Sequence, residues 1–213
     1  MTRPIRSYVL RQGRTTPAQT RALDQLYPKH GLAFSQQKIK SEKPLVLEIG
    51  SGMGETTIAI AKAHPEVDFV AVEVHGPGVG SLLNAIEKNG LRNLRVVRHD
   101  ALEVLEHMVA DGSLAAIHLF FPDPWPKKRH HKRRLVQPAF AALAARKLAR
   151  GGILHAATDW PDYAEWMAEV FAKEELLEPA QGGVFLKPLT KFEARGKRLG
   201  HPIRELFFRR RPQ

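Results

Sequence analysis

Cysteine is absent from this chain of 213 residues. Its absence excludes disulfides, thiolate nucleophiles and cysteine-ligated zinc, and it fits a protein of the reducing cytoplasm. No apolar run approaches the ~20 residues that a membrane-spanning helix needs. Residues 1–10 lack the apolar core of a signal peptide, and no internal repeat or long low-complexity segment is present. We therefore expect a soluble protein located in the cytoplasm.

The composition is that of a folded globule. Apolar residues make up 43% of the chain, and they include three tryptophans. A chain of this length can bury a sizeable core, so we expect one domain, or one domain with extensions.

Acidic residues are scarce at both ends of the chain, so its net charge of +11 is unevenly distributed. Residues 1–44 contain nine lysines and arginines but only two acidic residues, and residues 191–213 contain eight and two. Residues 45–190 contain 16 and 18, although they include six cations between 127 and 134. Positive charge confined to two flanks and one loop predicts a polyanionic partner such as a nucleic acid. An anionic membrane surface is the weaker alternative, because the basic run lacks the spacing of an interfacial helix.

From residue 45 onward, short apolar runs alternate with helical patterns. This alternation predicts an α/β fold with a mostly parallel central sheet and helices on both of its faces. Residues 183–186 and 204–210 are expected to form a final antiparallel strand pair. Upstream, we expect a helix near residues 19–26 and a polar, lysine-rich linker over 36–44. The other expected strands are 45–49, 68–72, 94–98, 115–121 and 153–158, and the expected helices are 56–63, 79–89, 102–109, 135–148 and 163–173.

A glycine-rich loop follows the first of these strands. Gly50, Gly52 and Gly54 let the backbone turn tightly and let a ligand approach closely. The dinucleotide fingerprint requires G-x-G-x-x-G, whereas this loop reads G-x-G-x-G and has Glu55 in the place of the last glycine. A carboxylate there would repel a pyrophosphate, so the loop disfavours NAD.

Carboxylates stand at the ends of four successive expected strands. Because ligands bind beyond the carboxyl ends of parallel strands, these side chains are expected to share one cleft. Glu73 lies 19 residues after Gly54 and is placed to accept both ribose hydroxyls, while Asp100 is placed to receive an adenine amino group. These features predict an adenosine ligand without phosphate, namely S-adenosylmethionine. The expected cofactor-binding residues are Glu48, Gly50, Gly52, Gly54, Glu73, Asp100, Ala101 and Asp123.

The fourth carboxylate belongs to a proline-rich turn with a basic run behind it. Asp123 stands in the sequence Phe-Phe-Pro-Asp-Pro-Trp-Pro, where the prolines keep it out of a regular helix. Residues 127–134 follow with their six cations, so a reaction centre is expected beside a phosphate-binding surface. Trp125 either stacks on a base or packs under the loop, and Trp160 and Trp166 are expected in the core.

The chain resembles the bacterial tRNA (guanine-N7-)-methyltransferases along almost its whole length. The resemblance depends on residues 6–14, on the glycine loop 47–54, on the Pro-Asp-Pro-Trp segment with its basic run, and on residues 190–201. It implies a Rossmann-like class I methyltransferase domain over 45–213 with a basic C-terminal tail, preceded by a basic N-terminal arm over 1–44.

The resemblance also implies an activity. The expected reaction transfers a methyl group from S-adenosylmethionine to N7 of the guanine at position 46, in the variable loop of tRNA. The enzyme is expected to need no obligatory protein partner, as a monomer or a homodimer, and no metal. Cofactor contacts are implied for Glu48, Glu73, Asp100 and Asp123, substrate contacts for Lys127, Asp159, Thr190, Lys191, Phe192 and Glu193, and RNA contacts for Arg129, His130, Lys132, Arg133 and Arg134.

The chemistry of the expected reaction assigns roles to two carboxylates. Guanine N7 holds a lone pair and no proton, so methyl transfer requires no general base. The enzyme must instead align N7, the methyl carbon and the sulfur. Asp123 and Asp159 suit the catalytic tasks of orienting the guanine and stabilising the positive charge that its ring gains.

Three alternatives remain open from the sequence. A nicotinamide-dependent oxidoreductase would use a similar sheet, but Glu55 opposes it. An RNA-binding module could retain a vestigial cofactor pocket. The methyltransferase could also act on another RNA. His130 and His131 lie among cations that would repel a metal, so phosphate contact or simple exposure is preferred for them over metal ligation.

Overall fold

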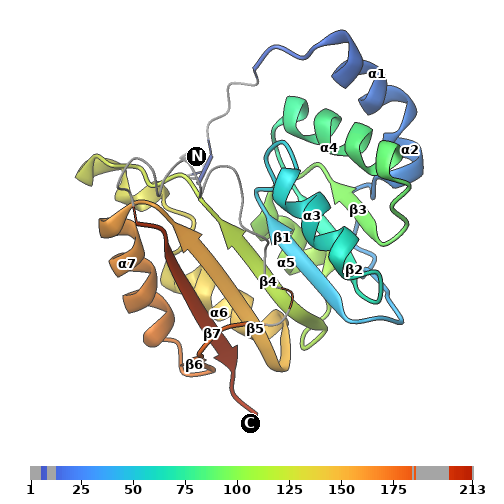
Figure 1. The fold of residues 1–213 in the computed structure, drawn as a ribbon. Helices are drawn as coiled ribbons and strands as arrows, with labels where there is room; N and C mark the ends of the chain where they lie inside the picture. Colours follow the sequence, from blue (N-terminus) through green and yellow to red (C-terminus); the bar gives the residue numbers. More distant parts are fainter. Residues whose placement is uncertain (1–5, 9–12, 184, 186–201, 213) are drawn as a thin grey trace.

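The central sheet has seven strands, in the order β3-β2-β1-β4-β5-β7-β6. The computed structural model describes residues 6–8, 13–183, 185 and 202–212 (Figure 1). Neighbouring strands run parallel from β3 to β5, and the last two strands run antiparallel to their neighbours. The expected α/β fold with an antiparallel C-terminal pair is confirmed. The strands are β1 Leu45–Ile49, β2 Asp68–Val72, β3 Leu94–Val97, β4 Leu114–Phe120, β5 Leu148–Thr158, β6 Leu177–Pro179 and β7 Arg204–Arg210.

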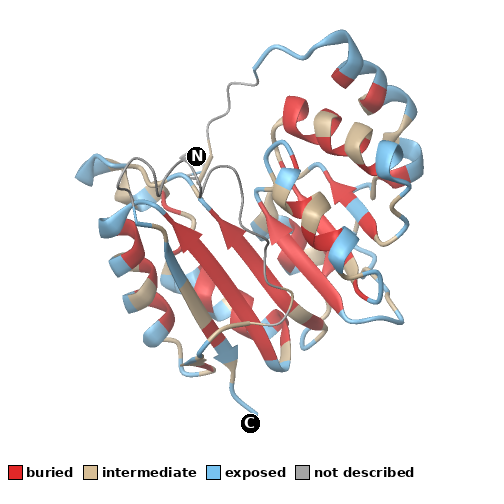
Figure 2. Cartoon of the chain, in the orientation of Figure 1, coloured by how far each residue is buried: buried red, intermediate tan, exposed pale blue. Residues whose placement is uncertain are grey.

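Helices cover both faces of the sheet. One apolar core joins the sheet to α5, α6 and α7, and a second joins it to α1, α3 and α4. Figure 2 shows β1 and β4 buried between these layers, and burial on both faces accounts for their almost continuously apolar sequences. The helices are α1 Pro17–Gln25, α2 Tyr27–His30, α3 Glu55–Ala63, α4 Gly76–Asn89, α5 Ala101–Met108, α6 Pro138–Lys147 and α7 Pro161–Ala172, with a 3-10 helix, η1, at Lys128–Arg133.

Two residues of the expected strand over 183–186 lie outside the described residues, and the two described ones, Gly183 and Phe185, are not in a strand; β6 lies beside β7 instead. Gly182 and Phe185 have φ values of 107° and 64°, which are incompatible with an extended strand. Leu177 instead pairs with Arg210 and places its side chain in the core. β5 also begins at Leu148, earlier than expected.

Residues 13–44 pack against the domain. Thr16 and Gln19 form a capping box that starts α1, and the Gln19 side chain donates to the Ser81 hydroxyl of α4 at 2.9 Å. Further along, the Leu32 N–H donates to the Val96 carbonyl at 2.8 Å. Residues 13–44 of the basic arm therefore lie on α4 and along β3, where they cover an edge of the sheet.

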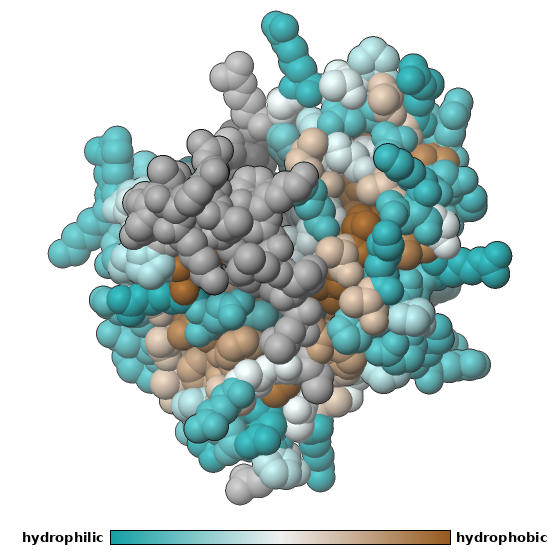
Figure 3. All heavy atoms as spheres, viewed as in Figure 1, coloured by the Kyte–Doolittle hydropathy of each residue, from teal (hydrophilic) through white to brown (hydrophobic). Residues whose placement is uncertain are grey.

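The face seen in Figure 3 is hydrophilic around its outline, and apolar side chains gather toward its middle. No helix in the described part of the chain combines the length and the apolarity that a bilayer span requires.

Candidate functional site

A cavity of about 400 Å³ opens at the carboxyl ends of β1, β2 and β4. Three strand-end residues, Ile49, Val72 and Phe120, form part of its wall, so the converging strands create the site. The cavity brings together four of the residues expected to bind the cofactor, namely Gly50, Glu73, Ala101 and Asp123. Its other lining residues are Ser7, Tyr8, Val74, His75, His99, Leu119, Phe121, Pro122 and Leu135.

The three loop glycines have different functions. Gly50 and Gly52 have φ values of 76° and 55°, and a Cβ added to either would meet open space. They therefore leave room beside the backbone for a ligand. Gly54 has a φ of 85°, and its Cβ would lie 2.5 Å from the Leu82 side chain. Its role is to let the loop pack closely on α4.

Glu73 is held in place by backbone groups on both sides. Its two carboxylate oxygens accept hydrogen bonds from the Gly52 and His75 N–H groups, each at 2.8 Å. The residue is 8% exposed. Each oxygen keeps a lone pair for another donor, so the fixed carboxylate can still accept hydroxyl hydrogens from a ligand in the cavity.

Glu48 lies behind the glycine loop and does not line the cavity. Burial raises the pKa of Glu48 to about 7, the neighbouring Thr57 hydroxyl lowers it, and the charge of Glu73 raises it further. Its position indicates support for the loop. The nearby Ser51 hydroxyl is also buried and has no hydrogen-bond partner among the described residues.

Asp100 is the N-cap residue of α5, between the cavity-lining residues His99 and Ala101. One of its carboxylate oxygens accepts a hydrogen bond from the Leu102 N–H at 2.9 Å and caps the helix. The Tyr8 hydroxyl lies near the carboxylate. Burial raises the pKa of Tyr8, and the negative charge of Asp100 adds to that increase.

Asp123 lies in a strained loop between β4 and η1, outside any helix as the prolines predicted. Phe121 and Trp125, two residues to either side, have φ values of 51° and 45°, a conformation that side chains with a Cβ rarely adopt. Such strain collects at functional sites. Partial burial raises the pKa of Asp123, and the nearby Arg133 guanidinium opposes that increase.

The basic run separates into exposed and engaged cations. Lys127, Arg129 and Lys132 are exposed on and beside η1. Arg133 lies over the Trp125 indole, with 3.8 Å between its guanidinium carbon and the ring centroid. The exposed cations can reach a phosphate backbone without rearrangement.

Arg134 is buried, which contradicts the expected RNA contact. The residue is 2% exposed, and its side chain donates to the Pro124 carbonyl at 2.9 Å and to the carboxylate of Asp162. Its guanidinium also lies over the Tyr163 ring. A buried cation needs such partners, and here they connect the Asp123 loop to α7.

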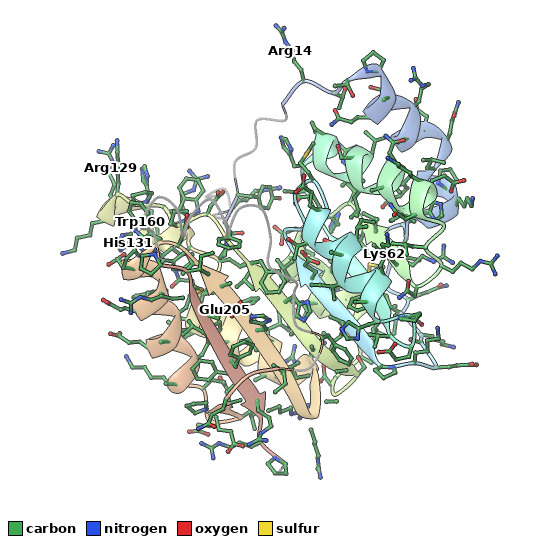
Figure 4. All side chains as sticks on the ribbon, viewed as in Figure 1. Arg14, Lys62, Arg129, His131, Trp160 and Glu205 are labelled. Atoms are coloured by element: carbon green, nitrogen blue, oxygen red, sulfur yellow. The ribbon has the colours of Figure 1, made fainter. Side chains whose placement is uncertain are left out.

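Asp159 and Trp160 follow β5 at the same end of the sheet. Asp159 is exposed and does not line the cavity. Trp160 is 39% exposed, so its expected place in the core is wrong. It precedes the first turn of α7, and Figure 4 shows it in the same part of the view as His131, which lies 4.0 Å from Asp162 of that helix. Trp166, in contrast, packs on the core as expected and donates to the Val136 carbonyl at 2.7 Å.

Two histidines of the basic run lie near the loop. The His130 ring meets the Trp125 ring edge-on, and partial burial and the neighbouring cations lower its pKa. His131 lies 4.0 Å from the Asp162 carboxylate. No group of three or more histidine, aspartate or glutamate side chains in the described ranges is placed to hold a metal ion.

Four expected substrate contacts lie outside the described residues: Thr190, Lys191, Phe192 and Glu193. Conversely, the cavity includes residues that sequence reasoning missed. Ser7 and Tyr8 belong to the resembling segment 6–14, which was the available signal. His75 and His99 are close neighbours of Glu73 and Asp100, and proximity to those strand ends could have indicated them.

Comparison with solved structures shows the class of fold. The chain shares its fold with an rRNA methylase from Streptococcus thermophilus, with a TM-score of 0.54 and 14% identity, over 80% of this chain and 89% of that one. The 16S rRNA methyltransferase KamB gives a TM-score of 0.57 and 18% identity, over 95% and 97%. At such low identity the likeness concerns the fold alone, which is that of the class I methyltransferases.

Sequence comparison identifies the family. The family model described as "Putative methyltransferase" matches residues 42–206. The tRNA (guanine-N(7)-)-methyltransferase of Methylobacillus flagellatus is 53% identical over 98% of this chain and 92% of its own. The protein of that name from Nitrosomonas eutropha is 54% identical over 96% of each chain. The chain belongs to the tRNA (guanine-N(7)-)-methyltransferase family.

Proposed function

We propose that the chain transfers a methyl group from S-adenosylmethionine to N7 of guanine 46 in the variable loop of tRNA, giving 7-methylguanosine. The observation that carries the proposal is one cavity that joins Gly50, Glu73 and Asp123, with exposed cations in the segment that follows Asp123. The names of the relatives indicate the same reaction.

The cavity fits the cofactor. Its volume of about 400 Å³ lies in the range of small-molecule sites. Glu73 would accept the ribose hydroxyls, Gly50 and Gly52 would let the ligand approach the backbone, and Ser51 has a buried hydroxyl to donate. Asp100 and Ala101 would contact the adenine, and Glu48 and Gly54 would support the loop. Bound there, S-adenosylmethionine supplies an electrophilic methyl group.

Asp123 would act on the guanine. As an acceptor for the guanine N1–H and N2–H groups it orients N7, and as an anion it stabilises the charge that the ring gains. A proton-abstracting role is unnecessary, because N7 carries no proton. Asp159 would assist from the end of β5, together with Lys127 and the segment from Thr190 to Glu193.

The RNA would lie across the exposed cations. Arg129, His130, Lys132 and the part of Arg133 left accessible would contact phosphates, and the basic arm over 1–44 would extend this surface. Figure 4 shows Arg14 pointing outward from that arm. The target guanine must leave its stack, because side chains cannot reach N7 in the deep groove of A-form RNA. We place this activity in the cytoplasm, without an obligatory protein partner.

A labelled methyl-transfer assay tests the proposal. Full-length protein, labelled S-adenosylmethionine and unmodified tRNA transcript should give labelled 7-methylguanosine on nucleoside analysis. A transcript with adenine at position 46 is the matched control and should remain unlabelled. Retention of the tRNA without any transfer would overturn the proposal in favour of an RNA-binding module with a vestigial pocket. Labelling at another position would also contradict it.

A further inference from the structure

Three successive backbone carbonyls of the N-terminal arm accept hydrogen bonds from two side chains of the Asp123 region. The Trp125 indole N–H donates to the Ser7 carbonyl at 3.0 Å. The Arg133 guanidinium donates to the Arg6 carbonyl at 3.3 Å and to the Tyr8 carbonyl at 3.2 Å. Residues 6–8 are thereby tied to a part of the chain that follows them by more than a hundred residues.

The side chains of Trp125 and Arg133 also contact each other. The Arg133 guanidinium lies over the Trp125 ring at 3.8 Å, which fixes the direction of its donor groups. Trp125 adopts the left-handed backbone conformation that turns its indole toward the arm. Neither residue lines the cavity. Their donors face the arm, so their hydrogen bonds go to the arm and not to a ligand in the cavity.

Two of the hydrogen-bonded arm residues, Ser7 and Tyr8, form part of the cavity wall. Ser7 and Tyr8 line it between the Asp123 loop and the start of α5, where the Tyr8 hydroxyl lies near Asp100. On another side of the cavity, the Gly13 N–H donates to the His75 ring at 3.1 Å. The described parts of the arm are thus attached at two places around one cavity.

The geometry points to a role for Trp125 and Arg133 as positioning residues for the cofactor. They hold Ser7 and Tyr8 against the proposed S-adenosylmethionine cavity. This inference rests on the proposed cofactor. It assigns to Arg133 a function in cofactor affinity, where the family resemblance implies RNA contact alone.

The charge of Arg133 and its hydrogen bonds to the arm have opposite expected effects on cofactor affinity. The charge of the nearby Arg133 opposes the increase that burial causes in the pKa of Asp123. Arg133 therefore contributes positive potential near the cavity. S-adenosylmethionine carries a sulfonium cation, which this potential repels. Removing Arg133 would therefore strengthen cofactor binding if charge alone mattered. Weaker binding of S-adenosylmethionine in a variant without Arg133 would instead show that Arg133 acts by holding Ser7 and Tyr8 in the wall of the cavity.

Calorimetry on the full chain without RNA tests the inference. Arg133→Ala should weaken binding of S-adenosylmethionine about tenfold, because two charge-assisted hydrogen bonds are lost. Trp125→Phe keeps the ring and loses the N–H, and it should weaken binding about fivefold. Arg150→Ala is the matched control, because Arg150 is exposed near the start of β5, at the end of the sheet opposite the cavity. Its affinity should remain that of the unaltered protein.

Two further variants separate positioning from charge. Arg133→Lys keeps the charge but lacks the two-pronged donor geometry, so its affinity should still fall. In Arg133→Lys, the product S-adenosylhomocysteine, which lacks the sulfonium charge, should lose affinity by the same factor as S-adenosylmethionine. In the double variant Tyr8→Ala with Arg133→Ala, the second change should add nothing to the first, because Arg133 acts through this wall.

Unchanged affinity in Arg133→Ala, or additive effects in the double variant, would overturn the inference. A chain that binds the cofactor with these dependences but transfers no methyl group to tRNA would refute the proposed function and leave the inference standing.

Discussion

The carboxylate of Glu73 accepts a hydrogen bond from the Gly52 N–H at 2.8 Å, and so joins the end of β2 to the loop that follows β1. The second bond, from the His75 N–H, leaves the carboxylate little freedom. Two adjacent strand ends therefore present one preorganised acceptor to the cavity. Preorganisation of this kind lowers the entropy that binding must overcome.

Glu73→Gln should weaken cofactor binding about 10- to 100-fold, because hydrogen bonds to a charged acceptor contribute about 1.5–3 kcal/mol. The amide keeps the size of the side chain but turns one acceptor into a donor. Calorimetry with S-adenosylmethionine measures the loss. Glu165→Gln, on the exposed side of α7, is the control and should bind normally. Equal affinities for the two variants would remove Glu73 from the cofactor site.

Asp123→Asn should lower the rate of methyl transfer about 100- to 1000-fold, as expected when a group that stabilises transition-state charge is neutralised. Single-turnover transfer to tRNA measures the rate, and calorimetry should show a much smaller change in cofactor affinity. Because the pKa of Asp123 is raised, the rate in the unaltered protein should fall with decreasing pH as this carboxyl gains a proton. A rate in the variant that matches the unaltered protein would contradict the role.

Much of the sheet could be predicted because its signals are local. β1 and β2 coincide with their expected ranges, since each is a short apolar run that ends at a turn or a carboxylate. The meeting of Glu73 and Asp123 at one cavity also follows from sequence, because parallel strands place their carboxyl ends on one edge. β6 was missed because three residues carry too little periodicity to be recognised.

The remaining features depend on contacts between distant parts of the chain. A basic run indicates solvent exposure, and only the fold reveals that Arg134 meets Asp162 and the Pro124 carbonyl. The attachment of Ser7 to Trp125 similarly joins residues 118 positions apart. Periodicity also cannot show that Trp160 lies just outside the buried face of α7.

Arg134→Met should destabilise the fold by about 1–3 kcal/mol, because the variant leaves the Pro124 carbonyl without its donor. The cost should stay below the 3–5 kcal/mol of a broken buried pair, since the Asp162 side chain is 62% exposed and can be hydrated. Urea unfolding measures the change, with the exposed Arg129→Met as control. Unaltered stability combined with weaker tRNA binding would restore the RNA-contact role.

Glu48→Gln should make the stability of the protein less dependent on pH. The folded pKa of Glu48 is about 7, above its ordinary value of 4.5. Between these pH values the unfolded chain loses the proton first, so Glu48 lowers stability as the pH rises. The penalty reaches about 3 kcal/mol above pH 7. Relative to the unaltered protein, the variant should gain stability from pH 4.5 to 7 and then remain level. Urea unfolding at several pH values measures this difference, and a constant difference would contradict the burial of a neutral carboxyl.

His118 should have the opposite effect to Glu48, because its contribution makes the protein less stable as the pH falls. It is fully buried in β4, and neither ring nitrogen has a hydrogen-bond partner among the described residues. Burial, with smaller repulsion from His155 and His64, lowers the pKa of His118 from 6.5 to about 3. Below pH 6.5 His118 becomes protonated in the unfolded chain but stays neutral in the folded chain. The protein therefore loses stability as the pH falls. The loss amounts to about 2 kcal/mol at pH 5. His118→Leu should remove this part of the acid sensitivity, because leucine has no titratable group. Urea unfolding of both proteins at pH 7.5 and 5 measures it: the variant should lose less stability than the unaltered protein, and equal losses would show that His118 becomes protonated without unfolding.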